Sequence, residues 1–364
     1  MFTPQLYAPV YYIVLALITL FLSIRYAQYP AYRVGIQQKQ TIGYSLILLV
    51  AVLLFIGLRP LSWAFVDMRN YYIYYNKIID GGIEFSFDFH TQNILFDNLF
   101  NWMALSGINI NVLFFFIAFI YFTFMWLACR KWFPKDTLYA FVIYLSAFST
   151  FSYGTNGIKA GAAASIFMLA LSYRHKSLLL SILLALISWG FHHSMYVVIF
   201  AYILVLLVNN PKYYLYGWFL CIVFALLKIN PLQQIMLALS DESGSEYLTS
   251  TESEGWHSAI GFRPDFLLYS AIPVLIGFYT IFKSNIKSIE YTMLFNIYLT
   301  LNSLWILCMY IPYNNRIAYL SWFLLPIVSV YPMFRLDMWS KQYKILNLVV
   351  WIYMSFSLFA VYFF

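Results

Sequence analysis

Charged residues are scarce in this 364-residue sequence, where Asp, Glu, Lys and Arg together make up only 10%. Soluble domains usually contain about 25% charged and 45–50% apolar residues, whereas 63% of this chain is hydrophobic and 22% is aromatic. The low charge therefore excludes a soluble globular domain, and the high apolar content excludes a disordered chain. The composition predicts an all-α polytopic integral membrane protein, because helices and closed barrels are the structures that span a bilayer.

Cysteines are also few: Cys129, Cys221 and Cys308 each lie inside an apolar run. This placement excludes a disulfide framework, and the chain has neither a CxxC motif nor the Cys/His spacing of metal sites. An HExxH motif is missing as well. We therefore expect metal-free chemistry and no cofactor. Basic residues are scattered between apolar runs, a pattern that reports membrane orientation and does not indicate a nucleic acid partner.

The apolar runs predict about twelve transmembrane helices, because a span needs roughly 17–25 apolar residues. The segments are 7–24, 43–58, 108–128, 137–152, 158–173, 177–191, 194–208, 214–229, 266–282, 291–311, 317–333 and 345–363. Some of these are short, so the expected number of spans lies between 10 and 13. The first run has no basic n-region and no small-residue cleavage site, and we interpret it as the first span.

Lysines and arginines predict the orientation of these spans. Alternate connections carry fourteen basic and three acidic residues on one side, and seven basic and eleven acidic residues on the other; these account for all 21 Lys and Arg and all 14 Asp and Glu. The more basic side is assigned to the cytoplasm. Both termini and two long connections, 59–107 and 230–265, are then extracytoplasmic. We expect one membrane domain, 1–364, with an interfacial amphipathic helix at about 92–105.

Polar residues near span ends are candidate functional residues, because charged groups at membrane depth are costly. Those on the expected extracytoplasmic side are Arg59, Asn156, Lys159, His192, His193, Arg263, Asn314, Asn315 and Arg316. Lys159 and Arg316 open helices at ends where both the helix dipole and the positive-inside trend disfavour cations, which favours a functional role. Arg59 alone is equally well explained as a side chain that snorkels to the headgroups.

Cations beside helix N-termini form anion sites, and the natural anion at an outer membrane face is a lipid phosphate or diphosphate. Diphosphate is a good leaving group, so a transferase would need charge stabilisation and one base, His192, His193 or Asp67, to accept a proton. Tyr71 belongs first to an aromatic belt, with sugar stacking as the alternative. The GIKAGAAAS stretch favours close helix packing over phosphate binding.

Five short elements, in this order, resemble the EpsG/Wzy group of polysaccharide polymerases. They are Arg59 followed by Asp67 and Tyr71; Asn156-Gly157-Ile158-Lys159; Phe191-His192-His193-Ser194; GFRPDFLLYS around Arg263; and Asn315-Arg316-Ile317 followed by Tyr319. The resemblance covers about residues 55–325. Lys159-Ala160 stands where many members carry Arg-Gln, and Lys keeps the charge but loses the bidentate fork that suits a phosphate.

The resemblance implies a GT-C-like glycosyltransferase at the outer face of the bacterial cytoplasmic (inner) membrane. It would join oligosaccharide repeat units carried on undecaprenyl diphosphate and release undecaprenyl diphosphate, with O-antigen, capsule and exopolysaccharide all open as products. His192, His193 or Asp67 would be catalytic. The residues implied to bind diphosphate or sugar are Arg59, Lys159, Arg263, Arg316, Asn156, Asn315, Tyr71 and Tyr319.

Lipid-linked oligosaccharides and membrane lipids are the expected partners, with a chain-length regulator and a flippase as further candidates. A lipid-linked oligosaccharide flippase is one alternative function, but transporters often show internal repeats and a site at the bilayer midplane, and neither is apparent. A membrane acyltransferase is disfavoured because the histidines face outward. A ligase that attaches finished chains to an acceptor shares the polymerase chemistry and stays open.

Overall fold

The computed structural model describes residues 3–28, 38–82, 84–229, 232, 259–336, 338–339 and 341–363. Over these residues the regular secondary structure is entirely helical. This confirms the predicted all-α class and fits a polytopic membrane protein. Most of the predicted connection 230–265 lies outside the described residues, as do Arg33 in the first basic connection and Asp337.

All twelve predicted spans coincide with helices. These are α1 (Tyr7–Ala27), α2 (Gln38–Gly57), α5 (Ile110–Trp132), α6 (Thr137–Ser146) with α7 (Phe148–Thr155), α8 (Ile158–Tyr173), α9 (Leu178–Phe191), α10 (Met195–Leu207), α11 (Pro211–Leu226), α14 (Pro264–Phe278) with the π-helical turn η3 (Tyr279–Lys283), α15 (Ile289–Leu307), α16 (Asn314–Trp322) with α17 (Leu325–Arg335), and α18 (Gln342–Phe363). Within the described ranges, five helices are long and apolar enough to cross a membrane, and six shorter helices are apolar. The number of crossings stays a prediction.

Two predicted spans are interrupted, which the apolar pattern did not indicate. Ala147 separates α6 from α7 and has an extended backbone, with φ −68° and ψ 137°. The second break separates α16 from α17, which has a proline in its first turn; proline lacks an N–H and is favoured where a helix begins. Ala147 is only 1% exposed, and irregular backbone at membrane depth is tolerated where protein buries it. Leu324 at the second break is 0% exposed and keeps helical dihedrals, with φ −84° and ψ −20°.

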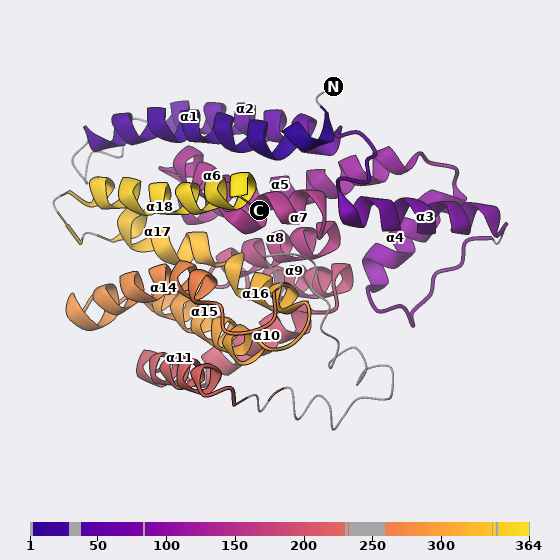
Figure 1. Ribbon diagram of the computed structural model, residues 1–364. Helices are drawn as coiled ribbons and strands as arrows, with labels where there is room; N and C mark the ends of the chain where they lie inside the picture. Colours follow the sequence, from indigo (N-terminus) through magenta and orange to yellow (C-terminus); the bar gives the residue numbers. More distant parts are fainter. Residues whose placement is uncertain are drawn as a thin grey trace. The chain divides into compact units, whose positions relative to one another are not determined.

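The connection 59–107 is folded and contains two helices. One is the expected amphipathic helix, α4 (Ile94–Leu105), and the other is α3 (Val66–Asp80), which sequence analysis did not predict. The two pack side by side (Figure 1). Buried Asn98 of α4 holds the loop before it: its amide nitrogen donates to the Asp88 carbonyl at 2.8 Å, and its oxygen accepts from the Asp88 N–H at 2.7 Å.

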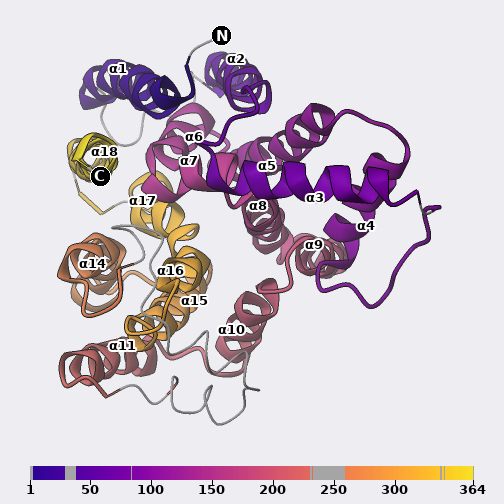
Figure 2. The same cartoon turned by 45° about the vertical axis from the view of Figure 1, so that its right-hand side comes forward.

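The chain packs as two compact units, and the first comprises residues 1–196 and 339–363. In this unit α8 lies between α5 and α9 (Figure 2). A Cβ at Gly161 would lie 2.9 Å from Cβ and 3.0 Å from the carbonyl oxygen of Tyr153 in α7, and Ala162, Ala163 and Ala164 are buried. The small residues of GIKAGAAAS therefore serve close helix packing, as predicted.

The second unit comprises residues 197–338. Asn302 of α15 links two neighbouring helices: its oxygen accepts from the Trp218 indole of α11 at 2.8 Å, and its amide donates to the Ser321 hydroxyl of α16 at 3.2 Å. The Trp322 indole donates to the Ser270 hydroxyl of α14 at 2.9 Å. Buried polar groups are satisfied in this way by neighbouring helices, and these bonds fix the C-terminal end of α16 relative to α14 and α15.

Candidate functional site

Arg59 follows α2 and is 3% exposed. Its guanidinium donates to the carbonyls of Ile56 at 2.8 Å and Thr155 at 3.1 Å, and it lies 5.6 and 5.4 Å from the ring centroids of Phe65 and Phe114. Burial lowers the pKa of Arg59 to about 10, so the side chain stays charged at neutral pH. Through these two carbonyls, Arg59 holds the end of α7 against α2. Its guanidinium is buried in protein and does not extend to lipid headgroups, as a snorkelling side chain would.

Asn156 and Lys159 follow directly from that helix end. Asn156 caps the C-terminus of α7, and its side-chain oxygen is buried with no hydrogen-bond partner among the described residues. Lys159 is half-buried in the first turn of α8, and its Nζ lies 5.7 Å from the Phe96 ring centroid of α4. The Asn156 side chain thus has an acceptor without a hydrogen-bond partner within the described part of the chain, and it lies three residues before a cation.

The two histidines connect α9 to α10, and their rings stack at 5.0 Å with an interplanar angle of 15°. His192 Nδ1 lies 2.5 Å from the Ser194 hydroxyl and accepts from the Ser194 N–H at 3.3 Å. His193 Nδ1 lies 3.1 Å from the Asn93 side-chain oxygen, which also accepts from the His193 N–H at 3.0 Å. The two Nδ1 atoms therefore face different partners: a backbone N–H and a hydroxyl at His192, and an amide oxygen at His193.

Asn93 is itself held by Asp97, one turn along α4. The Asn93 amide nitrogen lies 3.3 and 3.4 Å from the Asp97 carboxylate oxygens, and the Asn93 N–H donates to Asp97 at 3.0 Å. Burial and the charge of Lys159 lower the pKa of His193, while Asp97 opposes that shift. Asp97, Asn93, His193 and Lys159 thus form one cluster, and sequence analysis identified only the last two.

Tyr71 and Asp67 lie on α3. Tyr71 packs among Phe96, Phe100 and Phe114, with ring centroids 5.9, 6.0 and 6.4 Å away, and Asp67 is half-buried in the first turn. Phe96 is thus shared by Tyr71 and Lys159, and Phe114 by Tyr71 and Arg59. The fold therefore brings Arg59, Lys159 and Tyr71 together around one aromatic cluster, whereas Tyr72 and Tyr74 are exposed.

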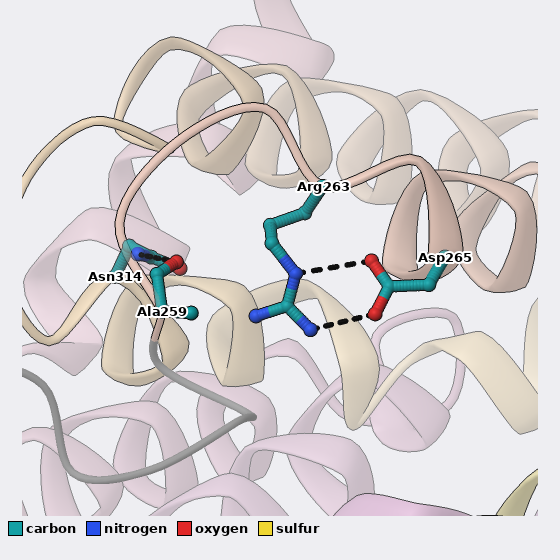
Figure 3. A network of polar contacts seen from close by, with 4 residues as sticks. All are labelled: Ala259, Arg263, Asp265 and Asn314. Carbon is teal, nitrogen blue, oxygen red and sulfur yellow. Dashed lines mark hydrogen bonds and ion pairs between the residues drawn. The ribbon is translucent and has the colours of Figure 1, made fainter.

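Arg263 is the main candidate before α14 in the second unit. It is 7% exposed and forms a bidentate ion pair with Asp265, at 3.0 Å from Nε and 2.6 Å from Nη2 (Figure 3). Its guanidinium also lies 4.5 Å from the Phe266 ring centroid. Asp265 lies two residues after Arg263 in the GFRPDF element. Sequence analysis did not predict that their side chains pair. The pair neutralises Arg263.

The start of α16 carries the remaining candidates. Asn314 is buried, and its amide donates to the carbonyls of Ala259 and Ile311 at 3.3 and 3.2 Å (Figure 3). Tyr313 precedes it in the left-handed conformation, with φ 55°, a conformation uncommon for a non-glycine residue. These two residues fix the backbone where the helix begins.

The first two turns of α16 carry three more candidates: Asn315, Arg316 and Tyr319. The Asn315 side-chain oxygen is buried and has no hydrogen-bond partner within the described part of the chain. Arg316 is exposed, and its guanidinium lies 4.8 Å from the Tyr313 ring centroid. Tyr319 is buried against Trp322, at 5.4 Å between ring centroids. The second unit therefore presents an accessible cation next to a buried acceptor, as the first unit does.

Comparison with known families gives one result. A family model described as "EpsG family" matches residues 43–364, which is most of the chain and includes every candidate residue in both units. Comparisons with curated proteins and with solved structures gave no match.

Proposed function

The chain belongs to the EpsG family, and from this premise we propose that it is a membrane-bound polysaccharide polymerase. Its substrates are oligosaccharide repeat units linked to undecaprenyl diphosphate, and it acts at the outer face of the bacterial cytoplasmic membrane with both termini extracytoplasmic. The family match carries the proposal. The cation and histidine clusters support it, because a lipid diphosphate needs cations and an attacking hydroxyl needs a base.

The reaction transfers the growing chain. The hydroxyl oxygen of the non-reducing sugar on the next lipid-linked unit attacks the anomeric carbon of the growing chain. The bond between that carbon and the diphosphate oxygen breaks, and undecaprenyl diphosphate leaves with the electron pair. A histidine takes the hydroxyl proton. Developing negative charge on the diphosphate is stabilised by cations, which is the largest contribution expected for such a leaving group.

Burial divides the four candidate cations into two roles. In the first unit, Lys159 is assigned to the diphosphate, while Arg59 positions the end of α7 through the Thr155 carbonyl. In the second unit, Arg316 is assigned to anion binding, while Arg263 is engaged by Asp265. The buried oxygens of Asn156 and Asn315 accept sugar hydroxyls. Tyr71 and Tyr319 line the places where sugar rings bind.

The test is a gel of surface and lipid-linked glycans from a strain that lacks the gene and carries wild type, Lys159→Ala or Arg316→Ala. Wild type restores a ladder, and each variant leaves single repeat units at the surface although the protein accumulates. Normal chain length in both variants would overturn the diphosphate assignment. In the strain without the gene, single units trapped on the inner leaflet would instead identify a flippase, and a full-length ladder left on the carrier lipid would identify a ligase.

A further inference from the structure

We propose that Asn93 and Asp97 are positioning residues that select His193 as the base and fix its reactive nitrogen. In this arrangement Asn93 holds a proton on His193 Nδ1, and the lone pair on Nε2 receives the proton of the acceptor hydroxyl. The inference rests on the proposed polymerase function and adds to it the identity of the base and the two residues that orient it.

The orientation of the Asn93 amide follows from contacts at both ends. Its nitrogen faces the Asp97 carboxylate at 3.3 and 3.4 Å, and a carboxylate only accepts hydrogen bonds. Its oxygen faces the backbone N–H of His193 at 3.0 Å, and an N–H only donates. Turning the amide over would place acceptor against acceptor at one end and donor against donor at the other, so the network permits one orientation.

That orientation fixes the histidine tautomer. The Asn93 oxygen has no proton, so His193 Nδ1, 3.1 Å away, must donate one to it. In a neutral imidazole one ring nitrogen donates and the other accepts, so Nε2 carries the lone pair. Asn93 is 3% exposed, and its contacts with Asp97 and with the His193 N–H keep the oxygen in place.

His192 has the opposite tautomer. Its Nδ1 accepts from the backbone N–H of Ser194 at 3.3 Å, so the proton of the neutral ring is on Nε2. The lone pair of His192 is then on Nδ1, where the Ser194 N–H and hydroxyl already engage it. His193 keeps its lone pair on Nε2, so of the two neighbouring histidines we assign His193 as the base.

Burial and the charge of Lys159 favour the neutral form of His193, which is the form that can accept a proton. The groups that face it are the stacked ring of His192, Lys159 of α8, and Asp97 of α4. Burial and Lys159 lower the pKa of His193, and Asp97 raises it. Because a general base works in its neutral form, the rate should rise with pH through this pKa and then level off.

The experiment measures the initial polymerisation rate against pH, with purified full-length protein in lipid nanodiscs and lipid-linked repeat units extracted from the deletion strain. Asp97→Asn removes the charge that raises the pKa of His193, so the acidic limb moves to lower pH. Asn93→Asp places a carboxylate directly on Nδ1, so the acidic limb moves to higher pH by about one unit or more. His193→Ala lowers the rate by about 10²–10⁴-fold.

Asp88→Asn is the matched control. It removes one carboxylate from the loop before α4 that accepts from the His90 N–H. Among the described residues its side chain makes no hydrogen bond to His192 or His193, so the pH profile should not move. A lower rate with an unshifted acidic limb in both Asp97→Asn and Asn93→Asp would overturn the inference and leave these residues a structural role. If His193→Ala kept its activity while His192→Ala lost it, the assignment of His193 as the base would be wrong, but the proposed polymerase function would stand. Wild type that makes no polymer from these units would refute the proposed function itself.

Discussion

Replacing Gly190 by alanine tests whether the close contact between α9 and α4 sets the geometry at His193. A Cβ at Gly190 would lie 2.6 Å from Cγ and 2.7 Å from Cδ1 of Leu95. Carbon atoms in contact are normally about 3.5–4.0 Å apart, so the helices must separate by roughly 1 Å at this point. Leu95 cannot easily yield, because Cγ moves only by rotation about χ1, which is restricted in a helix.

Separating α9 from α4 would change the distance between His193 and Asn93 in the proposed site. Asn93 lies two residues before Leu95, and His193 lies three residues after Gly190, so the 3.1 Å contact between them spans the same gap. Overpacking of this kind destabilises a protein by about 1–3 kcal/mol. A misplacement of about 1 Å can lower a rate by about 10²-fold, so we expect Gly190→Ala to shorten the glycan ladder strongly while protein still accumulates.

The assay compares ladder length, protein abundance by immunoblot and thermal unfolding in detergent. The matched control is Gly217→Ala in α11, where a Cβ meets no atom within 4 Å; alanine there should be neutral or stabilising by about 0.5–1 kcal/mol. Adding Leu95→Ala to Gly190→Ala removes the clashing atoms and should restore chain length. A Gly190→Ala protein as active and as stable as Gly217→Ala would refute the reasoning.

Three further changes have defined outcomes. Burial raises the pKa of Asp136 from 3.8 to about 6, so the contribution of this carboxyl to stability is largest at low pH, where it is protonated, and is lost as pH rises from about 4 to 6. Asp136→Asn should therefore increase the free energy of unfolding at pH 7 by up to about 3 kcal/mol, seen as a higher unfolding temperature. Below pH 4 the variant should match wild type. Lys159→Arg should retain a ladder that Lys159→Ala loses, because charge is kept, and equal loss in both variants on glycan gels would contradict this. Gly161→Val should reduce protein accumulation on immunoblots, since the added Cβ meets the Tyr153 backbone at 3.0 Å, and normal abundance would disprove the contact.

Hydropathy was sufficient to locate the helices but not their interruptions. All twelve apolar segments coincide with helices, and where they contain a charge, as at Lys159 and Lys228, it lies near a segment end. The break at Ala147, by contrast, occurs inside an apolar run, where no residue type marks it. The helix α3 was missed for the opposite reason: VDMRNYYIYYNKIID mixes polar and aromatic residues and resembles a surface loop.

The sequence suggests candidate site residues where a charge stands out against an apolar background. Lys159, Arg316 and the histidine pair became candidates in this way. Asn93 and Asp97 were not, because an Asn before a helix with an Asp four residues later has the ordinary pattern of a helix start. Their relation to His193 is a contact across 100 residues of sequence, and it depends on how α4 packs against α9.

The four cations that the sequence presents as equivalent are separated by what they already bind. Arg59 and Arg263 are 3% and 7% exposed. Both terminal nitrogens of Arg59 donate to carbonyl oxygens, and Arg263 donates to a carboxylate. Removing a buried cation from such partners to bind a ligand would leave the partners unpaired, which is strongly unfavourable. Lys159 is half-buried and Arg316 is exposed, so an anion can approach either without that penalty. Alanine at Arg59 or Arg263 should therefore reduce protein stability first, whereas alanine at Lys159 or Arg316 should reduce chain growth in a stable protein; the opposite order of effects would mean that accessibility does not identify the diphosphate-binding cations.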